Sequence, residues 1–233
     1  MFWYDYWYIV LVMPAIIFSV ITSISVQSTF NRYSKVRSMR GITGAEAARR
    51  VLDANGLYNV KIAAVRGELT DHYNPKDNTV YLSESVYNNP STAAIGVAAH
   101  EAGHAVQHAK EYLPIKIRTA IVPATNFASR LSIPLILIGM LFSYSSLILL
   151  AYIGVACFSL STIFQLVTLP TEFDASRRAI KAISSYGILS RDELVGAKKV
   201  LTAAAMTYVA ALAVSLMQLL RLVLLVSGNS RRR

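Results

Sequence analysis

The chain has little cysteine and little charge, and each shortage limits what it can be. Its single cysteine, Cys157, excludes an internal disulfide and a structural zinc site built from several cysteines. Only 15% of the residues are charged and 54% are hydrophobic, which is too apolar for an ordinary soluble domain of 233 residues. The net charge of +10 comes from basic residues that flank apolar runs. That placement indicates membrane topology, and we expect no nucleic-acid partner.

Three long apolar runs indicate membrane segments. The first, Trp7 to Val26, has the length of one span, lacks the features of a cleaved signal peptide and precedes a basic stretch, residues 32–40. By the positive-inside rule, the segment after it is cytoplasmic. The second, Leu131 to Thr168, would be about 57 Å long as one helix, so it predicts a hairpin of two spans turning near residues 143–146.

The third run, Leu201 to Val226, is also long enough to span a bilayer. It contains Arg221 and is followed by the basic tail Arg231–Arg233. If this run crosses the membrane, the tail emerges outside, against the positive-inside rule. Two alternatives therefore remain open: a complete crossing, or a helix that is only partly embedded.

A metal-binding pattern lies in the helical stretch Thr92 to Glu111. His100 and His104 are four residues apart, so on a helix both imidazoles project from one face and can reach one zinc ion. Glu101 stands beside them, where its carboxylate can take a proton from a water molecule. This is the H-E-x-x-H pattern of zinc peptidases.

The third zinc ligand must come from elsewhere in the chain. The other histidines are His72 and His108, and His108 is about 12 Å from His100 along a helix, too far to share one metal ion. The best carboxylate candidate is Glu172, which alternatively caps a surface helix that starts after Pro170. Asp174 either orients a ligand histidine or pairs with a nearby arginine.

The polar segment between residues 58 and 87 contains two strand signals, at residues 60–65 and 78–82, separated by a turn-rich loop over residues 71–77. We expect Val80, Tyr81 and Leu82 to form the edge strand on which an extended substrate binds. In the loop, His72 or Tyr73 is a candidate donor to the oxyanion of the transition state. The simpler alternative is that His72 only braces its loop.

The motif at residues 100–108, together with the stretch Leu169 to Arg178, resembles the YugP-type neutral zinc metallopeptidase family of bacterial membrane proteins. The resemblance covers most of the chain, and the architecture is also similar to the HtpX-like and CAAX-prenyl-type membrane peptidases. It implies that Glu172 is the third zinc ligand. Ser176 stands where those more distant families usually carry an aspartate.

We therefore expect a mainly α-helical integral membrane protein with about four membrane-associated helices and a cytoplasmic, zincin-like α+β catalytic domain. The expected segments are an anchor at 1–27, catalytic parts at 28–128 and 169–200, a membrane hairpin at 129–168, and a C-terminal membrane helix with its basic tail at 201–233.

The expected function is that of a membrane-bound zinc endopeptidase with one Zn²⁺ ion, in a multi-pass protein of the cell membrane whose active site is cytoplasmic. Its expected partners are a peptide or membrane-protein substrate and the lipid bilayer, with a membrane-protein partner or a homo-oligomer left open. The alternative function is a non-catalytic, zinc-binding membrane scaffold or assembly partner.

Overall fold

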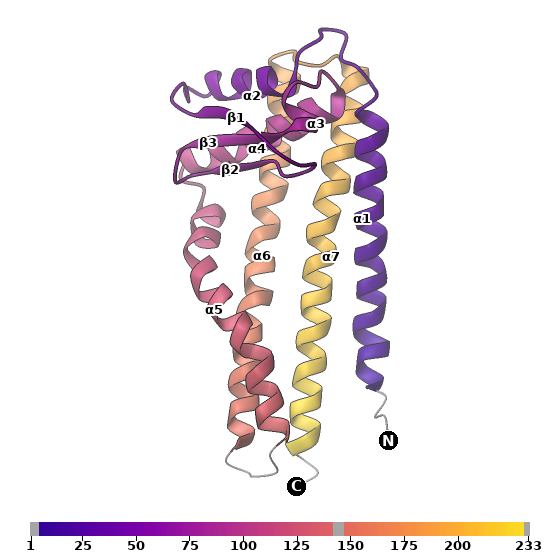
Figure 1. Ribbon diagram of the computed structural model, residues 1–233, viewed down its shortest axis with the longest axis vertical. Coiled ribbons are helices and arrows are strands. Elements are labelled where there is room, and N and C mark those ends of the chain that lie inside the picture. The colour runs from indigo at the N-terminus through magenta and orange to yellow at the C-terminus, as the bar shows by residue number, and fades with distance from the viewer. Residues whose placement is uncertain (1–4, 142–146, 231–233) are drawn as a thin grey trace. The chain divides into compact units, whose positions relative to one another are not determined.

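The computed structural model describes residues 5–141 and 147–230. Three features of the sequence lie outside them: the expected hairpin turn at residues 143–146, the basic tail Arg231–Arg233, and the aromatic residues Phe2 to Tyr4, a residue type that is typical of membrane interfaces. In chain order the elements are a π-helical turn (Tyr8–Val12), α1 (Met13–Tyr33), α2 (Gly44–Asp53), β1 (Lys61–Val65), β2 (His72–Asn74), β3 (Thr79–Ser83), α3 (Glu84–Tyr87), α4 (Thr92–Ala109), α5 (Leu113–Leu141), α6 (Ile148–Ser185) and α7 (Arg191–Ser230) (Figure 1).

Four helices are long and apolar enough to cross a membrane, namely Tyr8–Tyr33, Leu113–Leu141, Ile148–Ser185 and Arg191–Gly228. The structure is otherwise built from short helices and one three-stranded sheet. The expectation of a mainly helical chain with four such helices and a short strand segment is confirmed. The long apolar stretch after Leu131 is divided between α5 and α6, as the length argument predicts.

The chain divides into two compact units. We call the first the helical unit; it comprises Met1–Ile21, Ile117–Leu169 and Tyr208–Arg233. We call the second the sheet unit; it comprises Thr22–Lys116 and Pro170–Thr207. All four long helices, α1, α5, α6 and α7, contribute residues to both units.

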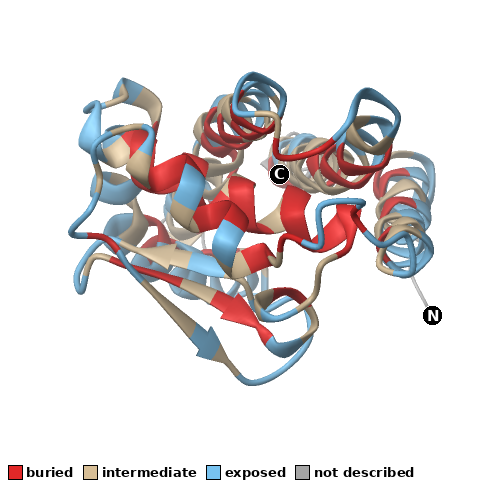
Figure 2. Ribbon diagram, turned by 90° about the horizontal axis from the view of Figure 1, so that it is seen from above, coloured by how far each residue is buried: buried red, intermediate tan, exposed pale blue. Residues whose placement is uncertain are grey.

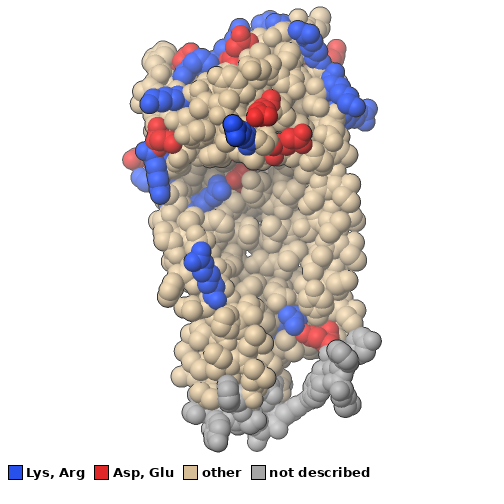
Figure 3. All heavy atoms as spheres, viewed as in Figure 1, with Lys and Arg blue, Asp and Glu red and all other residues tan. Residues whose placement is uncertain are grey.

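The helical unit has very few charged residues. In its described part these are Asp5, Arg118, Arg130 and Arg221. On the face shown in Figure 3, the charged side chains gather over the elements of the sheet unit. Arg221, which interrupts the last apolar run, donates from Nε to Asp5 Oδ2 at 2.7 Å and lies 5.2 Å from the Tyr8 ring centroid. An arginine in an apolar helix is thus matched by the one acid near the start of the chain.

The sheet unit is built on a mixed sheet with the order β1-β3-β2. β1 runs parallel to β3, with Ile62 opposite Val80, and β2 runs antiparallel to β3. Buried residues follow the central strand, whereas the outer strands are more exposed (Figure 2). The core of this unit continues from β3 into α2 and α4.

Two local predictions about this unit are wrong. The loop over residues 71–77 contains an additional strand, β2, which turns back onto β3 through residues 75–78. Because β1 and β2 flank β3, the segment Val80, Tyr81 and Leu82 is the central strand. Its backbone groups are already paired on both sides, so it is not an edge for substrate binding.

Side-chain caps explain where the two helices next to the sheet begin. Thr43 and Glu46 form a reciprocal capping box at the start of α2, which Gly56, with φ of +74°, helps to end. Ser91 Oγ accepts from the backbone N–H of Ala94 and so caps the start of α4. The cap fixes the first turn of the helix that carries the metal-binding pattern.

Candidate metal centre

Helix α4 presents His100 and His104 one turn apart, and it is buried along most of its length. Small residues make this possible, since alanines and glycines let neighbouring backbones approach closely. At Gly103 a Cβ atom would lie 2.9 Å from the carbonyl oxygen of Ala175 on α6. The absence of a side chain at Gly103 therefore lets α6 pack against the histidine-bearing helix.

Helix α6 brings Glu172 against the two histidines. The Glu172 side chain is only 2% exposed, and it lies inside a continuous helix that also contains Pro170. A helix start at Pro170 is therefore wrong, and so is the alternative that Glu172 caps a surface helix. A buried carboxylate in the middle of a helix needs polar partners, and the imidazoles of His100 and His104 supply them.

The distances among the three side chains fit one zinc ion. Glu172 Oε2 lies 3.3 Å from His100 Nε2 and 3.6 Å from His104 Nε2. Two atoms bound to one tetrahedral zinc ion at about 2.0–2.1 Å are about 3.3–3.4 Å apart. In the described part of the chain these residues form the one group of histidine, cysteine or acidic side chains close enough to hold a metal ion, with ligand atoms within 4.8 Å of one another.

The ring nitrogens that face away from Glu172 are held by other side chains. His100 Nδ1 lies 3.1 Å from Ser176 Oγ, and His104 Nδ1 lies 3.0 Å from Gln107 Oε1. The amide oxygen of Gln107 can only accept, so in the neutral form of His104 the proton is on Nδ1 and Nε2 keeps its lone pair for a metal ion. Ser176 thus contacts the ring of His100.

Gln107 is itself held in one orientation. It is fully buried, and its Nε2 donates to the Thr171 carbonyl at 2.8 Å and to Asp174 Oδ2 at 2.9 Å. Arg178 Nε in turn donates to the same Asp174 oxygen at 2.5 Å. Asp174 therefore pairs with Arg178, and it is linked to His104 only through Gln107.

Gln107 is the residue that sequence reasoning missed. From the sequence alone, Gln107 is notable only because the longer zinc-peptidase pattern H-E-x-x-H-x-x-G-x-x-H has glycine at that position. The available signal is its spacing, because a residue three after His104 lies on the same side of the helix. The partners on α6 that make Gln107 useful are more than 60 residues away in the chain.

Glu101 differs from Glu172 in having no hydrogen-bonding partner among the described residues. Its side chain is 8% exposed, and its charge acts on His104. Burial lowers the pKa of the His104 imidazole, but Glu172, Glu101 and Gln107 together outweigh that effect and raise the pKa. Glu101 is therefore a buried carboxylate beside the histidines that no described residue engages by a hydrogen bond.

The structure does not bring His72 or Tyr73 to this cluster. The His72 ring stacks on Tyr81, and its Nδ1 lies 2.8 Å from the Thr70 carbonyl oxygen, a contact that braces the loop. The Tyr73 hydroxyl donates to Asn78 at 2.9 Å. The Tyr73 ring also lies 5.4 Å from the ring of His108. No contact in the described residues places either side chain where an oxyanion would form.

Comparisons with known proteins agree with the cluster. Residues 8–227 match the model of a family described as "Putative neutral zinc metallopeptidase". The chain is 49% identical to "Putative membrane protease YugP" of Bacillus subtilis (strain 168) over 218 residues, which is 94% of this chain and 96% of that protein. No solved structure matches the chain significantly.

Proposed function

Because the chain belongs to the neutral zinc metallopeptidase family, we propose that it is a membrane-bound zinc endopeptidase holding one zinc ion at His100, His104 and Glu172. The observation that carries this proposal is the meeting of two helices: α4 supplies two imidazoles and α6 supplies a buried carboxylate at ligand distance. When bound, zinc would polarise the scissile carbonyl and lower the pKa of a water molecule.

Other side chains around the cluster transfer the proton and orient the two histidines. Glu101 accepts a proton from the attacking water and passes it to the nitrogen of the leaving amine. Ser176 and Gln107 hold the two histidine rings, so their Nε2 lone pairs point to one place. Asp174 and Arg178 hold Gln107 through the ion pair on α6.

The number of ligands supports catalysis over a structural role. A structural zinc site is normally closed by four protein ligands, whereas a catalytic site has three and keeps a position for water or substrate. Three ligand side chains meet in the described residues, and Glu101 stands next to them with no other partner. A scaffold that holds zinc only for structure has no use for such a carboxylate.

We place the substrate along β2 (His72–Asn74). An extended peptide can add to a sheet only at a free edge, and the edges here are β1 and β2. Helix α4 packs on β2 and β3, whereas β1 packs on α2 and α3. The edge next to the metal-binding helix is therefore β2, which replaces Val80–Leu82 in this role.

We further propose a multi-pass topology with the active site on the cytoplasmic side. The four apolar helices, together with the membrane protease named above, support membrane association. The basic residues that follow the first apolar run, Arg32 to Arg40, belong to the same sheet unit as the metal cluster. By the positive-inside rule that unit faces the cytoplasm.

The test compares two glutamate variants of the full chain in lipid vesicles, with casein cleavage and zinc content measured in both. Glu101→Gln removes the base, and we expect it to slow cleavage by roughly 10²–10⁴-fold while the zinc content stays at the wild-type value. Glu68→Gln, at an exposed position, is the matched control and should cleave normally. Cleavage at the wild-type rate by Glu101→Gln would disprove the general-base role. Wild-type protein that holds zinc but cleaves nothing would favour the scaffold alternative.

A further inference from the structure

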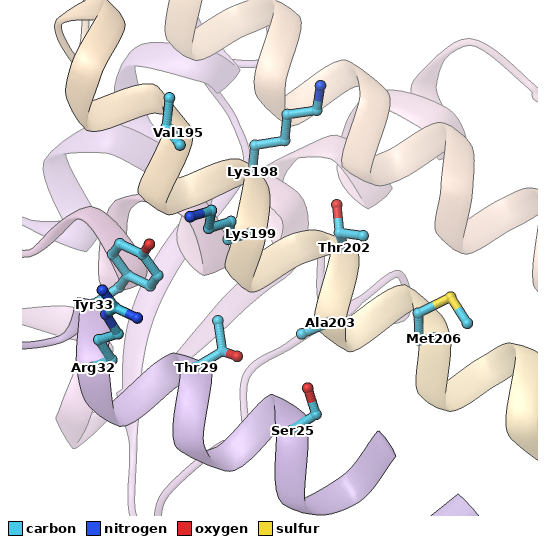
Figure 4. Close-up of a pocket in the computed structure, with 10 residues that line it drawn as sticks. All are labelled: Ser25, Thr29, Arg32, Tyr33, Val195, Lys198, Lys199, Thr202, Ala203 and Met206. Atoms are coloured by element: carbon cyan, nitrogen blue, oxygen red, sulfur yellow. The ribbon is translucent and has the colours of Figure 1, made fainter. Parts of the chain in front are cut away.

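A groove in the sheet unit lies between the end of α1 and the beginning of α7 (Figure 4). Its volume is about 650 Å³, which is within the usual range of ligand sites. It shares no lining residue with the cluster of His100, His104 and Glu172. The residues that line the groove are therefore distinct from the three residues of the metal cluster.

One end of the groove is cationic. Arg32 and Tyr33 of α1 face Lys199 of α7 there, with the Arg32 guanidinium 5.6 Å from the Tyr33 ring centroid (Figure 4). None of the described lining residues is acidic, and in the described part of the chain no carboxylate pairs with Arg32 or Lys199. Two unpaired cations that converge on one space favour an anion between them.

The groove becomes apolar in the opposite direction. Ala203 and Met206 of α7 lie at that end, and Ser25 of α1 lies across from Ala203 (Figure 4). Both helices change from basic to apolar in this same direction. Arg32 follows the apolar part of α1, and Lys199 precedes the apolar part of α7. A fitting occupant has an anionic group at one end and hydrocarbon at the other.

Close helix packing gives the groove a defined width at its cationic end. A Cβ atom on Gly196 of α7 would lie 2.7 Å from Cδ1 of Tyr33 and 2.9 Å from Oγ1 of Thr92. Only a glycine lets α7 approach Tyr33 this closely. The two helices thus meet beside Arg32 and Lys199, and the groove opens from that point.

We propose that this groove binds one anionic phospholipid, with its headgroup phosphate between Arg32 and Lys199 and an acyl chain along Ala203 and Met206. Guanidinium and ammonium groups are the usual phosphate partners, and the position is the one where both helices enter their apolar parts. A zwitterionic headgroup fits less well, because its own cation would face two cations. Free phosphate shares the chemistry of the headgroup but leaves the apolar end empty.

The test uses native mass spectrometry on the full chain in detergent, incubated with an equimolar mixture of phosphatidylglycerol and phosphatidylcholine. Wild-type protein should retain phosphatidylglycerol preferentially, and millimolar inorganic phosphate should not displace it. The double variant Arg32→Gln/Lys199→Gln should bind phosphatidylglycerol roughly thirtyfold more weakly, at about fivefold per lost cation. The control Lys61→Gln/Arg66→Gln loses the same charge at exposed positions on and just after β1 and should bind normally.

A second variant separates shape from charge. Ala203→Phe keeps every cation and fills the apolar end of the groove, so it should also weaken phosphatidylglycerol binding while the zinc content stays unchanged. Equal loss in the Lys61/Arg66 control would mean diffuse attraction and would overturn the site. Equal retention of both lipids, displacement by inorganic phosphate, or unchanged binding in Ala203→Phe would each overturn the lipid assignment.

Discussion

The two units of this protein treat polar side chains differently. In the helical unit two pairs of polar side chains satisfy each other: the ion pair of Asp5 with Arg221 and the hydroxyl pair of Thr162 with Ser215. In the sheet unit they form a connected set that converges on the Nε2 atoms of His100 and His104. Polar side chains that satisfy each other's hydrogen-bonding groups indicate a structural role. Side chains that direct the Nε2 lone pairs of two histidines at one position indicate a binding site for a metal ion.

The largest effect on stability should come from breaking the pair in the helical unit. Arg221→Leu leaves the Asp5 carboxylate without its partner, and it should lower the free energy of unfolding by about 2–4 kcal/mol. The side chains of the pair are 20% and 25% exposed, so we do not expect more. Unfolding of the full chain in mixed micelles, followed by circular dichroism, measures the change.

The double variant Asp5→Leu/Arg221→Leu is the control for that experiment, because it removes both charges and should recover most of the loss. The zinc content should stay at the wild-type value in both variants. If the double variant were as unstable as Arg221→Leu alone, the cost of the single change would not come from leaving the Asp5 carboxylate without its partner. Loss of zinc would show that the two units are coupled.

Gln107→Ala, in the sheet unit, should change zinc binding, which the variants of the Asp5–Arg221 pair leave unchanged. It removes the side chain that orients His104 and leaves Asp174 without one of its donors. We expect the zinc affinity to fall by roughly 10–100-fold, the usual cost of losing a side chain that supports a metal ligand. Chelator competition measures the affinity, and Gln27→Ala, at an exposed position on α1, is the control. Unchanged affinity would remove Gln107 from the site.

The raised pKa of His104 predicts how zinc binding depends on pH. In the metal-free protein the protonated imidazole stabilises the fold, and that contribution is present at low pH and lost as pH rises through the raised pKa. Zinc requires the neutral ring, so its affinity should fall by up to about tenfold per pH unit below that pKa. The increase in Tm that zinc produces should therefore grow as pH rises from below 6.5. A constant increase would contradict this competition.

Ser176→Ala should have the smallest effect of the series. It removes one contact to His100 Nδ1 at a partly exposed position, where a water molecule can take its place. We expect a loss in zinc affinity of only about two- to tenfold, at or below the low end of the range for such supporting contacts. Ser184→Ala, on the exposed side of the same helix, is the control. A loss of zinc affinity as large as that of Gln107→Ala would mean that the orientation of His100 depends on Ser176 as strongly as that of His104 depends on Gln107.

The features that could be predicted from the sequence depend on the local spacing of residues. His100, Glu101 and His104 stand on one helix, so their arrangement follows from helical periodicity, and the single-run length argument correctly separates α5 from α6. Glu172 is the best carboxylate candidate for the third ligand that two histidines require, and the structure brings it to the histidines. Its role as a zinc ligand stays a prediction.

Two of the wrong or missed predictions concern partners that are distant in the chain, and a third concerns a helix boundary. Strand order depends on which backbones meet, so nothing local reveals that β3 lies between β1 and β2. Pro170 looks like a helix start because proline lacks an N–H donor, yet α6 continues through it. Gln107 looks like a departure from a motif until Thr171 and Asp174 are seen beside it.

The measurement that tests the central claim most directly is the zinc content of purified Glu172→Ala, set against Glu101→Gln. Both variants remove a buried carboxylate from the same site, but only Glu172 is assigned to the metal ion. We expect one zinc ion per chain in the wild type and in Glu101→Gln, and a content well below one in Glu172→Ala. Full zinc in Glu172→Ala would contradict the proposed ligand set, whatever the variant does to cleavage.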